Sequence, residues 1–290
     1  MDMPKGKRSR MNRRTLLLRC GQLLLLGCLC ESCGILPAAE ATNPPSQFVF
    51  KTVGERKLVA DVSYPEQWRQ GDKRPAIVFW SGGGFSTGET HQFRPQAEHF
   101  AKRGMVAIRA EYRGRIKDGV GVDECLKDAI SAMRWVRKNA TMLGVDPNRI
   151  ISSGGSAGGF LATSVWTAEN LHSPSDDLSV SPKPNAMVLF NPAFGFETWK
   201  RARVDVPSGM PDPLRDIKKG MPPALVLIGS ADEFLPACQS FYAKGRTLGA
   251  RMEIEVYEGQ PHAFFNRPPW LEKTIERADQ FLEATGFLTK

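Results

Sequence analysis

A serine lies between glycines in the run Gly154-Gly155-Ser156-Ala157-Gly158, which has the spacing G-x-S-x-G. An apolar stretch that begins at Ile150 precedes this run, and the helix-favouring residues 160–163 follow it. A strand that turns sharply into a helix presents such a serine hydroxyl as a nucleophile, and the flanking glycines make room for the turn. The positive end of the helix favours a developing oxyanion. A plain glycine-rich turn or a phosphate-binding loop is the alternative interpretation.

The base that would activate this serine can be sought among only four histidines. A serine hydroxyl is a weak nucleophile until a positioned base takes its proton, and after a strand-turn-helix serine the partners follow in the order acid, then histidine. Two histidines precede Ser156, and His172 follows it too closely, in a polar loop. His262 lies in a Gly/Pro loop after the strand-like residues 252–257. We therefore predict that His262 is the base, against the alternative of a solvated loop residue.

The carboxylate that would orient this histidine is expected after another buried strand. Residues 224–229 form a continuous apolar run, which is typical of a parallel strand covered on both faces. Asp232 is the first carboxylate after this strand and is the predicted orienting residue, with its neighbour Glu233 as the second choice. The structural alternative is that Asp232 only caps a helix that begins near Pro236.

A run of three glycines, residues 82–84, follows the apolar residues 76–80. Successive glycines let backbone N–H groups approach a ligand closely, which suits an oxyanion hole. A flexible loop or a nucleotide site is the alternative, but no Lys-Ser/Thr pair follows the glycines and the spacing is not G-x-G-x-x-G. Phosphate binding is therefore not indicated.

Together these motifs resemble those of the esterase/lipase branch of the α/β-hydrolases related to hormone-sensitive lipase, over roughly residues 48 to 288. The resemblance implies that Ser156 is the nucleophile, Asp232 the orienting acid and His262 the base. It also implies that the amides of three residues form the oxyanion hole: Gly83, Gly84 and Ala157. One position departs from the family, because Ser81 stands where the glycine loop usually carries a histidine. That histidine normally has a structural role, so we expect activity to survive. The matching segments are residues 79–85, 111–113, 128–136, 154–159 and 262–266.

The remaining pattern predicts one domain that can carry this site. Antiparallel strands are expected over residues 48–50 and 57–64, and further strands over 105–110 and 186–190. Residues 122–136 carry apolar side chains at helical spacing, which predicts a helix that ends at Gly144 and Asp146-Pro147. Strands alternating with helices predict an α/β-hydrolase fold, a mainly parallel sheet with helices on both faces and a short cap segment.

The amino-terminal residues 1–41 are predicted to be an export signal that is removed, and residues 42–290 a single catalytic domain. The segment has a basic head and a short apolar core that is too short for a stable membrane span. Arg13 and Arg14 resemble a twin-arginine signal, with an ordinary Sec signal as the alternative, and Leu26-Gly27-Cys28 approximates a lipoprotein box with a lipid anchor at Cys28. The predicted location is periplasmic or extracellular.

Composition indicates few other partners. Residues 1–41 hold seven Lys or Arg and three Asp or Glu, so they contribute +4 of the formal charge of +8 and leave no excess that needs a nucleic acid to explain it. Four of the six cysteines also lie there, and we expect Cys125 to be a buried apolar residue and no disulfide framework to form. No Cys/His cluster has zinc spacing, so neither a metal nor a cofactor is predicted. Oligomeric state is left open.

The segment between Asn191 and Pro223 is predicted to cover the site, and it contains Phe194, Phe196, Trp199 and Met210. Its shortness favours short acyl groups, acetyl first, on a small soluble alcohol. Aromatic residues in an exported esterase can pack against the face of a sugar ring, so a carbohydrate ester is the leading substrate. The alternatives are a peptidase acting on small or acylated peptides and a catalytically silent binding protein on the same scaffold.

Overall fold

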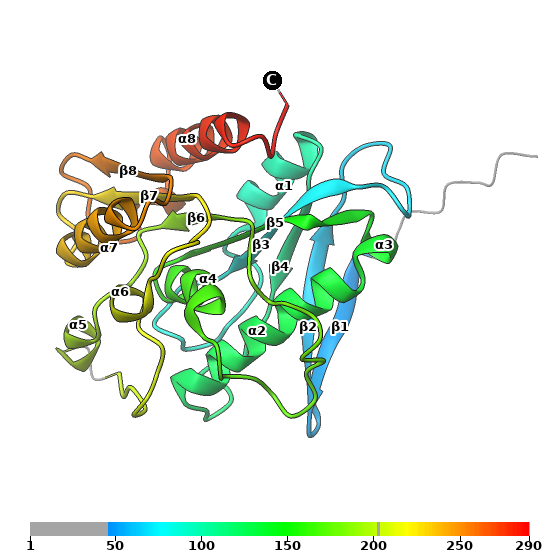
Figure 1. Cartoon of the computed structure of the whole chain (residues 1–290), viewed down its shortest axis with the longest axis horizontal. Coiled ribbons are helices and arrows are strands. Elements are labelled where there is room, and N and C mark those ends of the chain that lie inside the picture. Colours follow the sequence, from blue (N-terminus) through cyan, green and yellow to red (C-terminus); the bar gives the residue numbers. More distant parts are fainter. Residues whose placement is uncertain (1–45, 202–203, 290) are drawn as a thin grey trace, which may run out of the picture. The chain divides into compact units, whose positions relative to one another are not determined.

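The structure is a computed structural model that describes residues 46–201 and 204–289. Eight strands form one sheet in the order β1-β2-β4-β3-β5-β6-β7-β8 (Figure 1). β1 and β4 both run antiparallel to β2, while all other neighbouring strands are parallel. The fold is therefore the mainly parallel α/β-hydrolase sheet that the sequence predicts. The strands are β1 (Gln47–Val53), β2 (Arg56–Ser63), β3 (Arg74–Trp80), β4 (Val106–Ala110), β5 (Val145–Gly155), β6 (Ala186–Phe190), β7 (Ala224–Gly229) and β8 (Met252–Tyr257).

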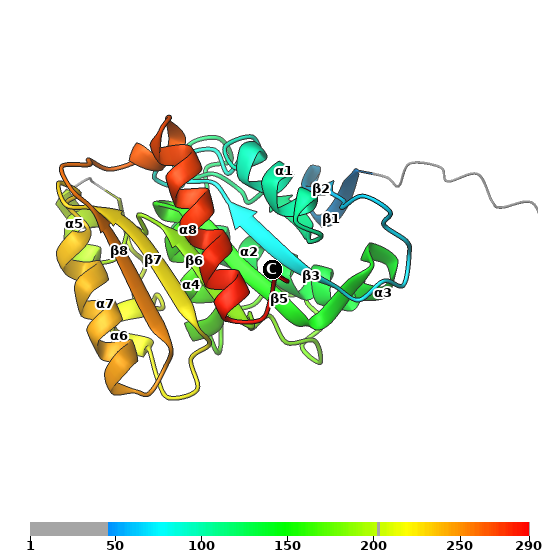
Figure 2. The same ribbon diagram turned by 90° about the horizontal axis from the view of Figure 1, so that it is seen from above.

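Helices cover both faces of this sheet. α1 and α8 pack on one face, whereas α2, α4 and α7 pack on the other, so that two separate apolar cores flank the strands (Figure 2). This arrangement explains why β3, β6 and β7 are continuous apolar runs, since both sides of each strand are buried. The helices are α1 (Arg94–Lys102), α2 (Val122–Lys138), α3 (Ala140–Leu143), α4 (Ala157–Thr167), α5 (Phe196–Arg201), α6 (Pro213–Asp216), α7 (Leu235–Thr247), the 3₁₀ turn η1 (Phe264–Asn266) and α8 (Trp270–Ala284).

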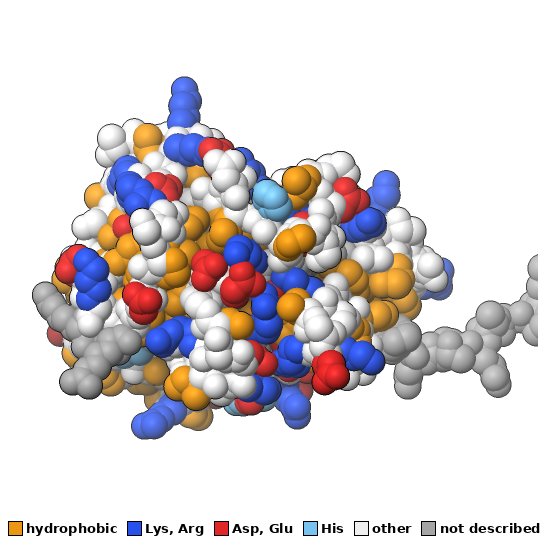
Figure 3. Space-filling model, turned by 90° about the horizontal axis from the view of Figure 1, so that it is seen from below, with side chains coloured by type: hydrophobic (Ala, Val, Ile, Leu, Met, Phe, Trp, Pro, Cys, Tyr) orange, Lys and Arg blue, Asp and Glu red, His pale blue; other side chains and the backbone are white. Residues whose placement is uncertain are grey.

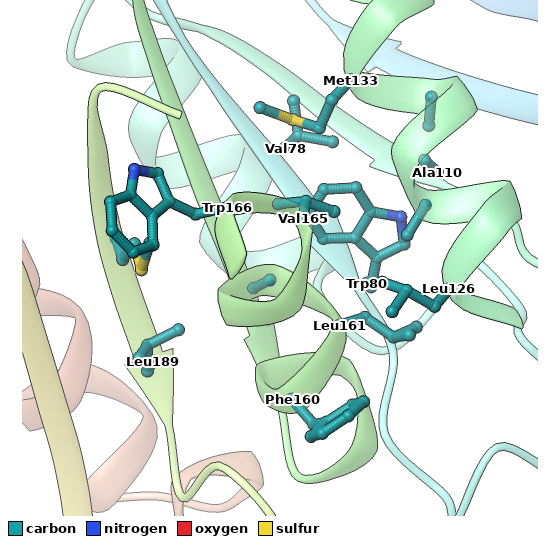
Figure 4. Packing of buried hydrophobic residues seen from close by; sticks show 14 of the residues in the cluster. Val78, Trp80, Ala110, Leu126, Met133, Phe160, Leu161, Val165, Trp166 and Leu189 are labelled. Carbon is teal, nitrogen blue, oxygen red and sulfur yellow. The ribbon is translucent and has the colours of Figure 1, made fainter. Parts of the chain in front are cut away.

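Trp80, the last residue of β3, anchors the larger core. Its side chain is fully buried and lies between α4, which contributes Leu161 and Val165, and α2, which contributes Leu126 (Figure 4). Burying an aromatic side chain of this size is among the largest single apolar contributions to folding. The end of β3 and the start of α4 are therefore fixed against each other, and both segments carry predicted site residues.

The helix predicted from residue 122 does not continue to Gly144: α2 ends at Lys138, and the separate short helix α3 ends at Gly144, which has φ +67°. β5 begins at once at Val145, so Asp146 and Pro147 lie in a strand. The missing N–H of Pro147 is tolerated because the pairing of β5 with β3 is irregular between Val145 and Ile150. Cys125 is fully buried in α2, as predicted, and burial raises the pKa of its thiol to about 12.

The segment after β6 contains the two short helices α5 and α6 and differs from expectation in how its aromatic residues are used. Phe194 is fully buried and Trp199 is 3% exposed, because both belong to the core that α4 and α7 cover. These two rings are therefore not available as a platform for a sugar.

The predicted export segment, its boundary at residue 41 and the candidate lipid site Cys28 lie outside the described residues. Within the residues that the structure describes, no helix is both long and apolar enough to cross a membrane. On the face seen from below, basic and acidic side chains are interspersed (Figure 3).

Candidate active site

Ser156 stands at the sharp turn between β5 and α4, which we call the nucleophile elbow (residues 154–158). Its backbone has φ +53° and ψ −118°, a conformation that a residue with a side chain rarely adopts. A Cβ added at Gly158 would lie 2.0 Å from the carbonyl oxygen of Trp80, and one at Gly154 would lie 2.5 Å from that of Gly158. The two glycines are therefore required by space, and the turn presents the serine at the amino-terminal end of α4.

His262 faces this serine from the loop that follows β8. Its Nε2 lies 2.8 Å from Ser156 Oγ, and its Nδ1 lies 2.7 Å from a carboxylate oxygen of Asp232. Because an ionised carboxylate only accepts hydrogen bonds, Nδ1–H donates to Asp232 and Nε2 is left to accept from the serine hydroxyl. The aromatic ring of Phe234 packs against the imidazole with ring centroids 5.2 Å apart. The structure thus brings together the three residues that the sequence singled out.

Asp232 uses its two carboxylate oxygens for two different purposes. Oδ2 accepts the hydrogen bond from His262, while Oδ1 accepts one at 3.0 Å from the backbone N–H of Phe234, just before α7 begins at Leu235. Asp232 therefore both orients His262 and caps the segment before α7, as the two interpretations of the sequence had it. Glu233, the second choice, is exposed on the surface. Asp232 is 4% exposed, so its carboxylate depends on these directed hydrogen bonds for stabilisation.

Asn191 is a residue of the site that the sequence analysis did not identify. It follows β6, is fully buried and has φ +34°. Its Nδ2 lies 3.4 Å from both ring nitrogens of His262, so the amide lies across the imidazole and does not point at one nitrogen. No periodicity in the sequence marks this residue, and only its place at the end of a predicted strand hints at a position near the site.

The glycine loop (residues 81–85) lies directly against the elbow. A Cβ added at Gly82 would lie 3.1 Å from Cβ of Ser156. Gly83 and Gly84 have φ +87° and +60°, values that favour glycine, and an added Cβ at either would meet no atom within 4 Å. The predicted oxyanion residues Gly83, Gly84 and Ala157 thus belong to two segments that both flank the serine.

Two side chains hold the beginning of this loop. The hydroxyl of Tyr112 donates to the carbonyl oxygen of Ser81 at 2.9 Å, and the side-chain oxygen of Gln92 accepts from the N–H of Gly82 at 2.6 Å. Burial raises the pKa of Tyr112 above its ordinary value, so the hydroxyl stays protonated and can donate. Ser81 itself contributes no such contact, because its Oγ is buried without a hydrogen-bond partner.

Behind Tyr112, a buried ion cluster fixes the start of the following loop. Asp128 of α2 is fully buried and accepts hydrogen bonds from the backbone N–H and the guanidinium of Arg113 and from Lys51 of β1. The hydrogen bond to Asp128 raises the pKa of Arg113 above its ordinary value. Removing a cation from this cluster would leave a buried carboxylate unpaired, which is strongly destabilising. The cluster therefore holds α2, β1 and residue 113 in one arrangement.

A cleft of about 750 Å³ opens beside the glycine loop. Besides residues 81–83, its lining is mostly polar and includes Thr87, Glu89, His91, Gln92, Arg94 and Asn266. The polar side chains of this lining can offer hydrogen bonds to a bound molecule. Within the described residues, no group of three or more His, Cys, Asp or Glu side chains is placed to hold a metal ion.

Known proteins match this chain over most of the described residues. Residues 60–199 match the BD-FAE family, and residues 179–288 match the dienelactone hydrolase family.

The chain is similar to the solved structure of esterase 2 from Thermogutta terrifontis, with 38% sequence identity and a TM-score of 0.80 over 84% of this chain and 96% of that one. It is 27% identical over 246 residues to the esterase LipU of Mycobacterium tuberculosis, which is 73% of this chain and 79% of the relative. It is 36% identical over 91 residues to the carboxylesterase NlhH of the same species, of which it spans 27%. It also spans less than a third of several other curated relatives.

Proposed function

The chain is a carboxylic ester hydrolase that belongs to the esterase branch of the α/β-hydrolases related to hormone-sensitive lipase, and from this premise we propose that it cleaves short-chain acyl esters with a triad of Ser156, His262 and Asp232. The observation that carries the proposal is the unbroken hydrogen-bond path from Asp232 through His262 to Ser156, with links of 2.7 and 2.8 Å. Such a path both orients the base and prepares the serine for attack.

In the proposed reaction, Ser156 Oγ attacks the ester carbonyl carbon while His262 Nε2 takes the hydroxyl proton. The carbonyl oxygen becomes an oxyanion that faces the amides of Gly83, Gly84 and Ala157. His262 then gives its proton to the leaving alcohol oxygen as that C–O bond breaks, and the acyl group stays on Ser156. A water molecule adds to the acyl carbon by the same route, its proton passes through His262 to Ser156, and the carboxylic acid leaves.

The nucleophile can be tested by substitution and by covalent labelling together. We expect Ser156→Ala to lower kcat by about 10⁶-fold, to the level that binding and oxyanion stabilisation alone provide. A fluorophosphonate should label Ser156 and no other residue. The related esterase 2 has been solved phosphonylated by sarin, which supports the choice of probe. Labelling at another residue, or near-normal turnover of the variant, would remove the triad assignment.

We propose that the acyl group is short, with acetyl preferred. Three buried rings meet beside the elbow: Phe160 of α4, Trp199 of α5 and Phe85 at the end of the glycine loop. The centroids of Phe160 and Trp199 are 4.4 Å apart, and those of Phe85 and Trp199 are 5.0 Å apart. Rings packed this closely leave little room for a long chain. Structures of esterase 2 with propionate and with butyrate bound are consistent with short acids in that relative.

Acyl-chain length can be tested with p-nitrophenyl acetate, butyrate and octanoate. We expect kcat/KM to fall from the acetate to the octanoate, and Trp199→Ala to raise the octanoate-to-acetate ratio because the ring no longer fills the space. An octanoate preference in the native enzyme would contradict the proposed pocket.

For the alcohol part of the substrate, we propose a hydroxyl-rich molecule, with carbohydrate esters as the leading class. The support is the cleft beside the glycine loop, since Thr87, Glu89 and Arg94 of its lining can hydrogen-bond to hydroxyl groups. Release rates on a panel of acetylated glycans and peptidyl anilides would separate this proposal from a peptidase. Absence of p-nitrophenyl acetate turnover would identify a silent scaffold instead.

We further propose that residues 1–41 direct export and that residues 42–290 form the single mature domain. The basic head and short apolar core of this segment support the proposal. Amino-terminal sequencing of exported protein should find a start near Thr42, whereas a blocked, lipidated Cys28 would indicate a lipoprotein. Combined Arg13→Lys and Arg14→Lys should stop export only if the route is the twin-arginine one.

A further inference from the structure

The peptide bond between Ser81 and Gly82 is held from both of its ends by side chains. β3 ends at Trp80, so this peptide lies beyond the hydrogen bonding of the sheet. Its carbonyl oxygen accepts the Tyr112 hydroxyl at 2.9 Å, and its N–H donates to the side-chain oxygen of Gln92 at 2.6 Å. Because a peptide unit is planar and rigid, two contacts at opposite ends fix its orientation.

This orientation matters because the next two amides are those of Gly83 and Gly84. Both glycines have positive φ and open space around the position of a side chain. Glycine has wide conformational freedom, so nothing in these two residues themselves keeps their N–H groups pointed at a substrate. An oxyanion hole is effective only when its donors are already oriented. The peptide that precedes the two glycines is therefore the natural place to fix the loop.

Gln92 is itself oriented by a second side chain from the far end of the sequence. Its Nε2 donates to Oδ1 of Asn266 at 3.2 Å, and Nδ2 of Asn266 donates to the carbonyl oxygen of Ala263 at 3.1 Å. Ala263 directly follows His262. A continuous path of hydrogen bonds thus runs from the glycine loop, through Gln92 and Asn266, to the loop that carries the base.

We propose that Gln92 is a positioning residue that sets the glycine loop for oxyanion binding and couples it to the histidine loop. It supplies the support that residue 81 does not give here, because Ser81 Oγ is buried with no partner. Asn266 acts through Gln92 by fixing which end of its amide faces Gly82. The inference rests on the proposed function, since it assigns Gln92 a role in stabilising the oxyanion of that reaction.

The test is Gln92→Leu, which removes the acceptor but keeps a similar volume. We expect kcat on p-nitrophenyl acetate to fall by roughly 10- to 100-fold, less than for loss of an oxyanion donor itself, with KM changed by less than about twofold. Affinity for a trifluoromethyl ketone, whose adduct carries the same oxyanion, should fall in proportion to kcat/KM. Gln96→Leu is the matched control, because Gln96 in α1 is buried and both ends of its amide have no partner.

A double-mutant cycle separates positioning from a general structural role. Asn266→Leu should lower kcat less than Gln92→Leu, and the double variant should be no slower than Gln92→Leu alone, because Asn266 acts through Gln92. Asn266→Asp keeps an oxygen that accepts from Gln92 but loses the donor to the carbonyl oxygen of Ala263, so its kcat should lie between those of Asn266→Leu and the native chain.

Three results would overturn the inference while leaving the proposed function intact: an unchanged kcat in Gln92→Leu, an equal loss in Gln96→Leu, or fully additive effects of the two leucine substitutions. Failure of the proposed function looks different, because native protein would then neither hydrolyse the ester nor be labelled at Ser156.

Discussion

The nucleophile elbow and the glycine loop touch each other, but different forces require glycine in each. In the elbow, a side chain at Gly158 would overlap the backbone of Trp80 at 2.0 Å. In the loop, a side chain at Gly83 or Gly84 would meet nothing within 4 Å, and only the positive φ favours glycine. The elbow and the adjoining Gly82, whose added Cβ would lie 2.9 Å from the carbonyl oxygen of Gly155, are therefore specified by packing against backbone. Gly83 and Gly84 depend instead on their backbone angles and on the side chains that hold the loop.

This difference separates two kinds of mutational effect. Changes in the elbow are expected to lower the free energy of unfolding, because the neighbouring backbone must move to make room. Changes in the loop are expected to lower the rate with little loss of stability, because they disturb the direction of N–H groups and not the packing. Activity and melting temperature, measured on the same variants, distinguish the two.

After Ser156→Ala, the largest effect on rate is expected at Asp232, which acts on the elbow serine through His262 and by its charge. Asp232→Asn keeps an oxygen for the N–H of Phe234 but favours the wrong histidine tautomer, so kcat should fall by roughly 10⁴-fold in a folded protein. Glu233→Gln, on an exposed neighbour, is the control and should cost far less. If the two variants rank in the opposite order in steady-state kinetics, the carboxylate has been assigned wrongly.

Gly83→Val tests the loop side of the comparison. A branched side chain disfavours φ +87° and should turn the N–H away from the substrate oxygen, so kcat should fall by about 10²- to 10³-fold or more. Because the space is open, thermal unfolding should change little. A large fall in melting temperature would mean that the loop, like the elbow, is specified by packing.

Gly158→Ala tests the elbow side. The overlap with two backbone oxygens should cost about 3 kcal/mol, which for a domain of this size lowers the melting temperature by roughly 6–12 °C. Gly84→Ala is the paired variant. It has room for the methyl group and bears only the cost of a left-handed conformation, about 1 kcal/mol. Equal melting temperatures in calorimetry would remove the distinction between the two regions.

Ser81→His is expected to have the smallest effect. The change restores the usual family residue but adds a side chain that does not touch the reacting carbonyl, so kcat should change by less than about tenfold. Tyr112 and Gln92 already hold the adjoining peptide. If the native protein has no activity and the Ser81→His variant is active, the native chain is a silent scaffold and the enzymatic proposal fails.

The positions of Ser156, His262 and Asp232 could be predicted because each has a local signal. Ser156 has close glycines, His262 has a place in the chain order, and Asp232 is the first carboxylate after a buried strand. The strands and the helix over residues 122–138 were predictable for a related reason, since burial on one or both faces produces a recognisable pattern of apolar residues in the sequence.

Other parts of the site have no such pattern in the sequence. Gln92 and Asn266 are 174 residues apart, and nothing in either segment indicates that they meet. Asn191 depends on the packing of its strand end against the imidazole. Trp199 could be predicted to lie near the site but not to be buried, because its exposure is decided by Phe85 and Phe160 from distant segments.

The separation of the triad along the chain has a consequence for the time at which the enzyme becomes active. His262 lies 106 residues after Ser156 and beyond β8, which is an edge strand of the sheet. Parallel strands joined by long crossovers pair slowly, since distant segments must first come together. With His262 as the proposed base, the serine is expected to stay unactivated until the last strand has paired. Recovery of hydrolysis after unfolding should accordingly coincide with the final step of refolding and not with formation of the elbow.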